Sequence, residues 1–388
     1  MEGGGVLSSV AILTHSFLDA YNGRIDKIYG GGLERYLYEL CLLLRKLGAE
    51  PEVYQLAFRK PFETRLKTTE LAGMKVHGLF CGQIEKVAEI FEEMSHKAAA
   101  PIIYASCIWH PIRYVPGSLG ICHGINWDRT DLVTSAKTQV ADNVQRALNE
   151  LWRIVSVDSH FLTYCRSVCH YFDPLKVELI PNSVDTSRFY PGERKEQGRT
   201  GLKVLFPRRI SHERGILPMM VAADALLERF PDLQMQFVGE TIEDADICRA
   251  FLFWLSCHPH RARITHEVKS FDEMRLVYAD ADIAVIPTVY SEGTSLSCLE
   301  AMSSGLPVVA TNVGGLNDLI LDGYNGRLVP PSAKRITAAL IELIEDREMR
   351  KALGIRARET ARCFDKNIWA GRWERVLKEY LRKEEAIS

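Results

Sequence analysis

Residues 283–310 constrain the fold of this chain more than any other part of the sequence. They begin with an apolar run at 283–287 and end with another at 306–310, and each run is typical of a buried strand. The intervening residues 296–304 have the composition of a crossover helix, so we expect the two strands to lie parallel in one sheet. Glu292 then lies in a loop at the carboxyl edge of a strand, where open α/β sheets bind their ligands.

Two glutamates and a helix start give this loop its chemistry. The N–H groups at a helix N-terminus suit phosphate or clustered sugar hydroxyls, because they carry partial positive charge. Glu300 has acceptor oxygens only, and such a carboxylate can take two hydrogen bonds from a ribose diol. Taken alone, Glu300 fits a capping box with Ser297 equally well, and Glu292 fits a solvated loop acid. The residues at the expected helix start are Gly293, Thr294, Ser295 and Leu296.

Length, charge and cysteine usage exclude several classes of protein. A chain of 388 residues is too long for one ordinary core, so we expect two domains. The formal net charge of -2 argues against a general nucleic-acid binder. The 10 cysteines form no C-x2-C pair, which favours core thiols in a reducing compartment over a metal site or a disulfide framework. No apolar run reaches the length of a membrane span, and we expect a cytoplasmic protein, free or loosely attached to the inner face of a membrane.

The first half of the chain has two candidate site segments, each after a predicted strand. The strand at 10–13 is followed by a long loop, residues 15–30, whose role the sequence does not define. Gly31 and Gly32 follow this loop and precede a helix, where glycine lets a ligand approach the backbone closely. His123 ends a second buried strand, so its imidazole can face a sugar hydroxyl or satisfy a core backbone group.

The second half repeats the pattern with cationic residues. After a strand at 203–207, Arg209 and Arg214 lie on the loop that leads into the next helix, and guanidinium groups form fork-like contacts with diphosphate oxygens. Gly239 ends the following strand. The D-x-D pairs at 244–246 and 280–282 fit ordinary turn acids, so we predict no metal site.

These motifs resemble those of the retaining family-4 glycosyltransferases. Glu292 and Glu300 match the E-x7-E motif of that family, and Gly31 and Gly32 resemble its glycine-rich first loop. His123 stands where the family has a histidine facing the donor sugar. Residues 208–215 resemble the family pattern G-R-L-x-x-x-K-G, with Arg209 and Arg214 at the phosphate-binding places. Arg208 replaces the usual glycine and Arg214 the usual lysine, which preserves charge but changes hydrogen-bond geometry.

The resemblance implies an α/β protein of the GT-B fold, with two Rossmann-like domains facing across a cleft. We expect residues 1–190 to form an acceptor-side domain and residues 191–365 the donor domain. A final helix at 366–388, with aromatic and aliphatic residues along one face, is expected to pack back on the first domain.

The implied activity is metal-independent transfer of a sugar, with retention, from a nucleotide-diphosphate donor to a hydroxyl acceptor. UDP is the favoured nucleotide, no cofactor is expected, and the acceptor is a carbohydrate, a lipid-linked molecule or another alcohol. The implied catalytic residues are Arg209, Arg214, Glu292 and His123; Gly31, Gly32, Gly239, residues 293–296 and Glu300 are implied to bind the donor. A GT-B epimerase, a sugar phosphorylase and a non-catalytic nucleotide-sugar binder are the alternatives. The sequence leaves the oligomeric state open.

Overall fold

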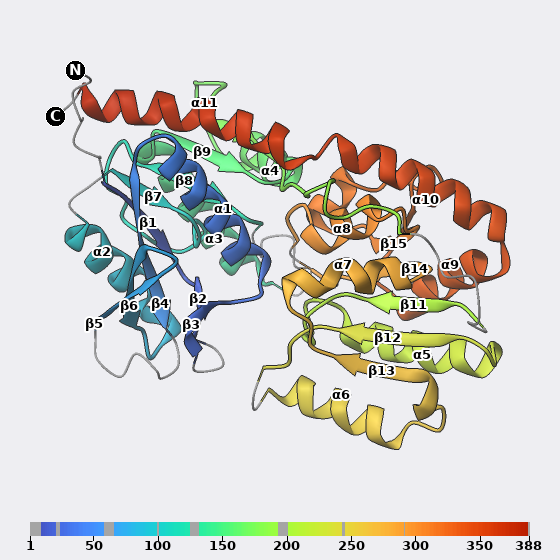
Figure 1. The fold of residues 1–388 in the computed structure, drawn as a ribbon. Helices are drawn as coiled ribbons and strands as arrows, with labels where there is room; N and C mark the ends of the chain where they lie inside the picture. Colours follow the sequence, from blue (N-terminus) through green and yellow to red (C-terminus); the bar gives the residue numbers. More distant parts are fainter. Residues whose placement is uncertain are drawn as a thin grey trace. The chain divides into compact units, whose positions relative to one another are not determined.

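The computed structural model describes residues 9–20, 24–57, 66–98, 101–124, 132–192, 201–242, 245–290 and 292–386, and each is placed in one of two compact units (Figure 1). Unit 1 contains residues 1–180 and 370–388, and unit 2 contains residues 181–369. Each unit is an α/β domain with its own sheet and core.

Unit 1 is built on a sheet with the strand order β10-β9-β8-β7-β1-β4-β6-β5. All neighbouring pairs are parallel except β5 with β6. Its strands are β1 (Ser9–Thr14), β4 (Glu50–Ala57), β5 (Leu66–Leu71), β6 (Met74–Phe80), β7 (Ile102–Tyr104), β8 (Leu119–Cys122), β9 (Arg153–Ser156) and β10 (Val177–Leu179). The helices are α1 (Gly32–Lys46), α2 (Val87–Lys97), α3 (Thr134–Glu150), α4 (Ser159–Val168) and the greater part of α11 (Lys366–Glu385).

The order of these strands creates a switch point between β1 and β7. From β1 the chain runs outward through β4 and β6, and then returns to place β7 on the other side of β1. Ligand sites of open α/β sheets form at such a reversal, outside the carboxyl ends of the strands. A small antiparallel pair, β2 (Leu18–Asp19) with β3 (Arg24–Ile28), lies in the long loop after β1, and the sequence analysis did not anticipate it.

The last helix belongs mainly to unit 1 because its apolar face is buried there. Trp373 is fully buried and its indole N–H donates to the Tyr36 hydroxyl at 2.7 Å. Tyr380 is also buried, and its hydroxyl donates to the carbonyl oxygen of Ile102, on β7, at 2.9 Å. The spacing of aromatic residues in 366–388 therefore marked a buried helix face.

Unit 2 is built on a fully parallel sheet with the order β13-β12-β11-β14-β15-β16. Its strands are β11 (Lys203–Phe206), β12 (Gln234–Val238), β13 (Ile264–Glu267), β14 (Ile283–Ile286), β15 (Val308–Thr311) and β16 (Arg327–Val329). Its helices are α5 (Ile216–Arg229), α6 (Asp246–Cys257), α7 (Phe271–Asp280), α8 (Leu296–Ser303), α9 (Ala333–Glu345) and α10 (Arg347–Arg362).

The central strands of unit 2 are apolar on both faces, as helices on both sides of a parallel sheet require. On β14, Ile283 and Val285 join the core under α5, α6 and α9, whereas Ala284 and Ile286 join the core with α7, α8 and α10. The chain leaves β11 toward β12 and β13, and returns to place β14 on the other side of β11. The switch point of unit 2 is therefore between β11 and β14.

The division between the units follows Ile180, whereas the sequence analysis placed it after Tyr190. Residues 182–190 belong to unit 2 because their contacts are there. The backbone N–H of Asn182 donates to the Thr294 hydroxyl at 2.8 Å, Val184 forms a β-bridge with Asp365, and Phe189 lies in the unit 2 core. The charged residues 193–200, which have the composition of a linker, lie outside the described residues. No helix among the described residues is long and apolar enough to span a membrane.

Candidate active site

Two loops meet at the switch point of unit 2. One runs from β11 to α5 and the other from β14 to α8, and the N–H of Val289 donates to the carbonyl oxygen of Glu213 at 2.9 Å. Gly215, the N-cap of α5, has a φ of 80°, and a Cβ at this position would lie 1.8 Å from the carbonyl oxygen of Pro287. Glycine is therefore required here for both backbone conformation and space.

The paired loops build a charged cluster around the Glu292 carboxylate. Arg208 Nη2 and Arg214 Nη1 each donate to Glu292 Oε2 at 2.6 Å, and Thr288 Oγ1 donates to the same oxygen at 2.7 Å. The side chains of Arg208 and Glu292 are only 6% and 9% exposed, whereas that of Arg214 is 26% exposed. Charge-assisted hydrogen bonds of this kind offset the cost of burying a carboxylate.

The cluster keeps its charges at neutral pH. Burial favours the protonated form of Glu292, but Arg208, Arg214 and the Thr288 hydrogen bond outweigh it and hold the pKa of this carboxyl below its usual range. Burial lowers the pKa of Arg214 to about 10, aided by the neighbouring Arg208 and Arg209 and opposed by Glu292. An ionised carboxylate and charged guanidinium groups therefore coexist at this edge of the sheet.

Arg209 and Gly239 lie next to this cluster. Arg209 is partly exposed, and its charge acts on both Arg214 and Glu213. Gly239, just after β12, packs against the backbone of the arginine loop: a Cβ there would lie 2.0 Å from the carbonyl oxygen of Arg208. The N–H of Ile210 donates to the carbonyl oxygen of Glu240 at 2.9 Å, which ties the same two segments together. Glycine at position 239 therefore allows the close backbone contact that holds the segment with Arg208 and Arg209 in place.

The start of α8 is held by side chains from several elements. Ser295 is the N-cap residue, and its hydroxyl accepts from the Cys298 N–H and, at 2.7 Å, from Arg208 Nη1. The Thr294 hydroxyl accepts from the N–H of Asn182, so the hydroxyls of Thr294 and Ser295 both have partners in the protein. The residues at this helix start retain backbone N–H groups as candidate donors to a ligand.

Gly314 and Gly315 contact the backbone of the glutamate loop, the loop between β14 and α8 that carries Glu292. Gly315 donates its N–H to the carbonyl oxygen of Glu292 at 2.8 Å, and a Cβ on Gly315 would lie 2.4 Å from the carbonyl carbon of Gly293. Gly314 has a φ of 50°, and a Cβ there would lie 2.1 Å from the Glu292 carbonyl oxygen. The backbone of residues 292–294 is therefore fixed by direct contact with another loop.

Glu300 is buried in the middle of α8, with an exposed fraction of 3%. The hydroxyl of Tyr278, in the last turn of α7, donates to Glu300 Oε2 at 2.9 Å. Because α8 begins at Leu296 and is capped by Ser295, the alternative capping box between Ser297 and Glu300 does not form. The ribose-binding role of Glu300 stays a prediction.

The predicted residues of unit 1 gather near its own switch point. His123 directly follows β8, and its ring meets that of Tyr36 edge-on with centroids 4.6 Å apart. Burial, aided by the charge of His15, lowers the pKa of His123 to about 3, so the imidazole is neutral at physiological pH. Among the described residues no hydrogen-bond partner reaches the buried His123 Nε2. This nitrogen is a candidate contact for a ligand.

The glycine loop of unit 1 leads directly into α1. Gly31 is the N-cap residue in an extended conformation, and Gly32 is the first residue of the helix. A Cβ on Gly31 would lie 2.2 Å from Glu34 Oε2, so the buried carboxylate of Glu34 covers this glycine. Near the same sheet edge, the N–H of His15 donates to the Ser106 hydroxyl at 2.9 Å, which joins the loops after β1 and β7.

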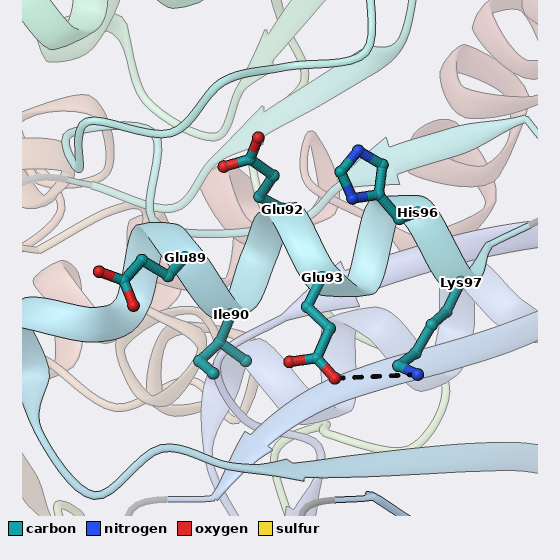
Figure 2. Close-up of a pocket in the computed structure, with 6 residues that line it drawn as sticks. All are labelled: Glu89, Ile90, Glu92, Glu93, His96 and Lys97. Carbon is teal, nitrogen blue, oxygen red and sulfur yellow. Dashed lines mark ion pairs between the residues drawn. The ribbon is translucent and has the colours of Figure 1, made fainter.

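Other groups of acids have structural partners or form no enclosed site. Asp282 accepts a hydrogen bond from the N–H of Lys203 at 2.8 Å, and Asp280 pairs with the side chain of Lys203. Asp244, in the other D-x-D pair, lies outside the described residues. A surface hollow lies along one helix, α2, where Glu93 pairs with Lys97 at 3.8 Å (Figure 2). Its lining residues are Glu89, Ile90, Glu92, Glu93, His96 and Lys97.

The structure brings Glu292 and Arg214 into direct contact, and places Arg209 and the start of α8 beside them. His123, Gly31 and Gly32 belong to the other unit. Sequence reasoning treated Arg208 only as a departure from the family pattern and did not identify Thr288 or Tyr278 as partners of the glutamates. An arginine after the apolar residues 204–207 was the available signal for Arg208. Thr288 is four residues before Glu292 in the same loop, whereas the contact of Tyr278 with Glu300 depends on packing between α7 and α8.

Comparison with known proteins identifies the relatives of this chain. Residues 192–360 match the family model described as Glycosyl transferases group 1. A D-inositol 3-phosphate glycosyltransferase from Corynebacterium diphtheriae is 26% identical over 395 residues, covering 90% of this chain and 89% of the relative. A phosphatidyl-myo-inositol mannosyltransferase from Mycolicibacterium smegmatis is 31% identical over 219 residues, which cover 54% of this chain and 52% of the relative.

Solved structures share the fold at lower identity. Sucrose-phosphate synthase from Thermosynechococcus elongatus has a TM-score of 0.75 and 18% identity, covering 98% of this chain and 100% of the other. WaaG, a glycosyltransferase involved in lipopolysaccharide biosynthesis, has a TM-score of 0.69 and 14% identity, covering 95% of this chain and 99% of the other. Residues 192–360 thus belong to the group 1, or family-4, glycosyltransferases, and the solved structures show that the chain has the GT-B fold.

Proposed function

We propose that this glycosyltransferase moves a sugar from a nucleotide-diphosphate donor to an acceptor hydroxyl with retention of the anomeric configuration. The observation that carries the proposal is the Glu292 carboxylate, held by Arg208 and Arg214 at the switch point of the unit 2 sheet. A switch point with fixed positive charge, a helix N-terminus and an oriented carboxylate suits an anionic ligand that also carries hydroxyl groups.

The chemistry assigned to this edge is stabilisation of a leaving diphosphate. As the bond to the sugar breaks, negative charge grows on the phosphate, and Arg209, Arg214 and the N–H groups at the start of α8 are the groups that neutralise it. Glu292 orients the donor sugar and Glu300 holds the ribose. The leaving phosphate accepts the proton of the incoming hydroxyl. His123 is neutral, so its role toward the donor sugar is hydrogen bonding and not charge stabilisation.

UDP-sugars are the first donors to examine. HepE from Anabaena, which shares the fold with a TM-score of 0.69 at 16% identity, was solved in complex with UDP-glucose. For the acceptor, the names of the relatives point to an inositol phosphate and to a phosphatidylinositol. We therefore include soluble and lipid-linked alcohols, and a lipid-linked acceptor would bring the protein to a membrane surface. Sedimentation with vesicles that contain phosphatidylinositol measures that association.

The proposal includes metal independence, because arginine side chains supply the positive charge that a divalent cation would otherwise supply to the diphosphate. Transfer should continue at the same rate in excess EDTA. Loss of transfer in EDTA, restored by magnesium or manganese, would contradict this part of the proposal.

The test begins with thermal unfolding in the presence of UDP-, GDP- and ADP-linked sugars, since a ligand that binds only the folded protein raises its Tm. The stabilising donor is then incubated with acceptor alcohols, and proton NMR of the product reports the anomeric configuration. Glu292→Gln should still be stabilised by the free nucleotide diphosphate but should transfer little sugar. Products of inverted configuration would contradict retention, and release of sugar phosphate that depends on added phosphate would indicate a phosphorylase.

A further inference from the structure

Arg208 occupies a position where the sequence pattern led us to expect glycine, and the structure gives it a specific contact set. Its guanidinium group is almost fully buried at the carboxyl end of β11. Nη2 donates to Glu292 Oε2 at 2.6 Å, and Nη1 donates to Ser295 Oγ at 2.7 Å. One planar side chain thus connects the glutamate loop with the N-cap of α8.

The contacts of the Glu292 carboxylate are asymmetric. Arg208, Arg214 and Thr288 all donate to Oε2, whereas none of the described residues donates to Oε1. Hydrogen bonds from several directions to a single oxygen restrict rotation of the carboxylate about its side-chain bonds. The second oxygen remains available to accept a hydrogen bond from a ligand.

Arg208 and Arg214 differ in their ability to serve another anion. Arg214 is partly exposed and, under the proposed function, binds the donor phosphates. A phosphate that draws on the Arg214 charge weakens the hold of Arg214 on Glu292. Arg208 has its terminal nitrogens engaged and is buried, so it continues to neutralise Glu292 when a donor is bound.

We propose that Arg208 is a positioning residue that holds Glu292 ionised and in one orientation, so that Oε1 accepts a hydroxyl group of the donor sugar. The inference rests on the proposed function for the identity of the ligand. The contact between Arg208 and Glu292 is independent of that ligand, and the two parts can therefore fail separately.

The pH dependence of Glu292 provides a readout that a purely structural role would not change. The charged groups that face it are Arg208 and Arg214, and the Cys298 thiol on α8 stays protonated because burial raises its pKa far above its usual range. Because the folded-state pKa of Glu292 is depressed, its contribution to stability is present above the unfolded pKa and is lost as pH falls through the folded pKa. Removing one cation raises the folded pKa, so this loss begins at a higher pH.

The experiment compares Arg208→Gln, Arg208→Lys and the wild type, with Arg229→Gln as the matched control. Arg229 is an exposed arginine of the same unit whose partner is Glu345. Unfolding is measured by urea titration from pH 4 to 8 (values chosen for the assay, around the carboxyl range), and kcat/KM is measured over the same range with the donor selected by the thermal panel. We also measure unfolding of Glu292→Gln and of the Arg208→Gln, Glu292→Gln double variant.

For Arg208→Gln we expect the acid limb of kcat/KM to shift upward by about one pH unit. At neutral pH, kcat/KM should fall on the order of 10- to 100-fold, because Glu292 loses its fixed orientation. Arg208→Lys retains the charge but cannot reach both partners as a planar fork, so its pH limb should stay near that of the wild type while kcat falls several-fold. In the double variant the pH-dependent loss of stability caused by Arg208→Gln should disappear.

The outcomes separate the two proposals. If Arg208→Gln has the pH profile and donor KM of the wild type, the positioning role is wrong. If Arg208→Gln does not fold, the test uses Arg208→Lys instead. A kcat of Arg208→Lys equal to that of the wild type would then show that the positioning role is wrong. If the wild type transfers no sugar from any donor, the proposed function is wrong, and the urea titrations alone decide whether Arg208 keeps Glu292 ionised.

Discussion

The switch points of the two units use the same topology but different chemistry. In unit 2 the loop after β11 carries arginines that hold an ionised glutamate on the loop after β14. In unit 1 the loops after β1 and β7 are joined by a hydrogen bond from the N–H of His15 to the Ser106 hydroxyl, and the nearby His123 is neutral. The doubly wound fold therefore sets where a ligand can bind in each unit, whereas the side chains on the loops decide which chemical groups can be bound there.

Under the proposed function, the guanidinium groups of unit 2 suit the charged part of a nucleotide sugar, whereas the neutral His123 of unit 1 suits hydrogen bonding to hydroxyl groups. Fixed guanidinium groups stabilise developing charge, whereas a neutral imidazole discriminates among hydroxyl groups. Substitutions on the two sides should consequently differ in the size of their effects and in the kinetic constant that they change.

The largest effect is expected for Arg209→Ala. If Arg209 stabilises charge that develops on the diphosphate, kcat should fall on the order of 10²–10³, or about 3–4 kcal/mol of transition-state stabilisation. Donor KM should change less, because the charge is smaller in the ground state. The measurement is steady-state kinetics with the preferred donor, and Arg229→Ala on the surface of unit 2 is the control. A near-normal kcat of Arg209→Ala would show that Arg209 is not a catalytic residue.

The sequence predicted the central strands of unit 2 and placed Arg209, Arg214 and Glu292 on loops at their carboxyl ends. Short apolar runs on 203–207 and 283–287 became β11 and β14, because strands buried on both faces leave a clear signal. The contacts that shape the edge were not predictable. Gly239 against the Arg208 carbonyl and Tyr278 against Glu300 join residues far apart in the sequence, and no local pattern encodes such contacts. Thr288 is only four residues before Glu292, but their contact depends on the conformation of an irregular loop.

The second prediction compares a glycine from each unit. A Cβ on Gly239 would meet the backbone of Arg208 at 2.0 Å, whereas a Cβ on Gly31 would meet the end of the Glu34 side chain at 2.2 Å. Backbone cannot move aside cheaply, but a side chain can. Gly239→Ala should therefore destabilise the protein by about 1–3 kcal/mol or more, and Gly31→Ala by clearly less. Urea unfolding of both variants provides the comparison, and equal losses would show that Gly31 is held as rigidly as Gly239.

The third prediction concerns Glu300 and its partner Tyr278. If Glu300 grips the ribose equally in the ground and transition states, Glu300→Ala should raise donor KM about tenfold while kcat changes little. Tyr278→Phe keeps the buried ring but removes the hydrogen bond to Oε2, so KM should rise about threefold, as expected for one lost hydrogen bond. An unchanged donor KM in Glu300→Ala would mean that this carboxylate serves the packing of α7 and α8 and not the ribose.

The smallest effect is expected at His123, and it tests whether the unit 1 edge is neutral. The folded-state pKa of His123 is about 3, against about 6.5 for an unfolded histidine, so protons bind preferentially to the unfolded chain as pH falls. The stability that comes from this neutral ring is present above the unfolded pKa and is lost as pH falls below it, toward the folded pKa. His123→Asn should therefore lose less stability than the wild type between pH 6.5 and 5 (a window set by these pKa values). His96→Asn, on the exposed face of α2, is the control (Figure 2). Urea unfolding across this range measures the slopes. Identical slopes for His123→Asn and the wild type would show that the folded protein does not hold the ring neutral, and that both switch points can carry positive charge.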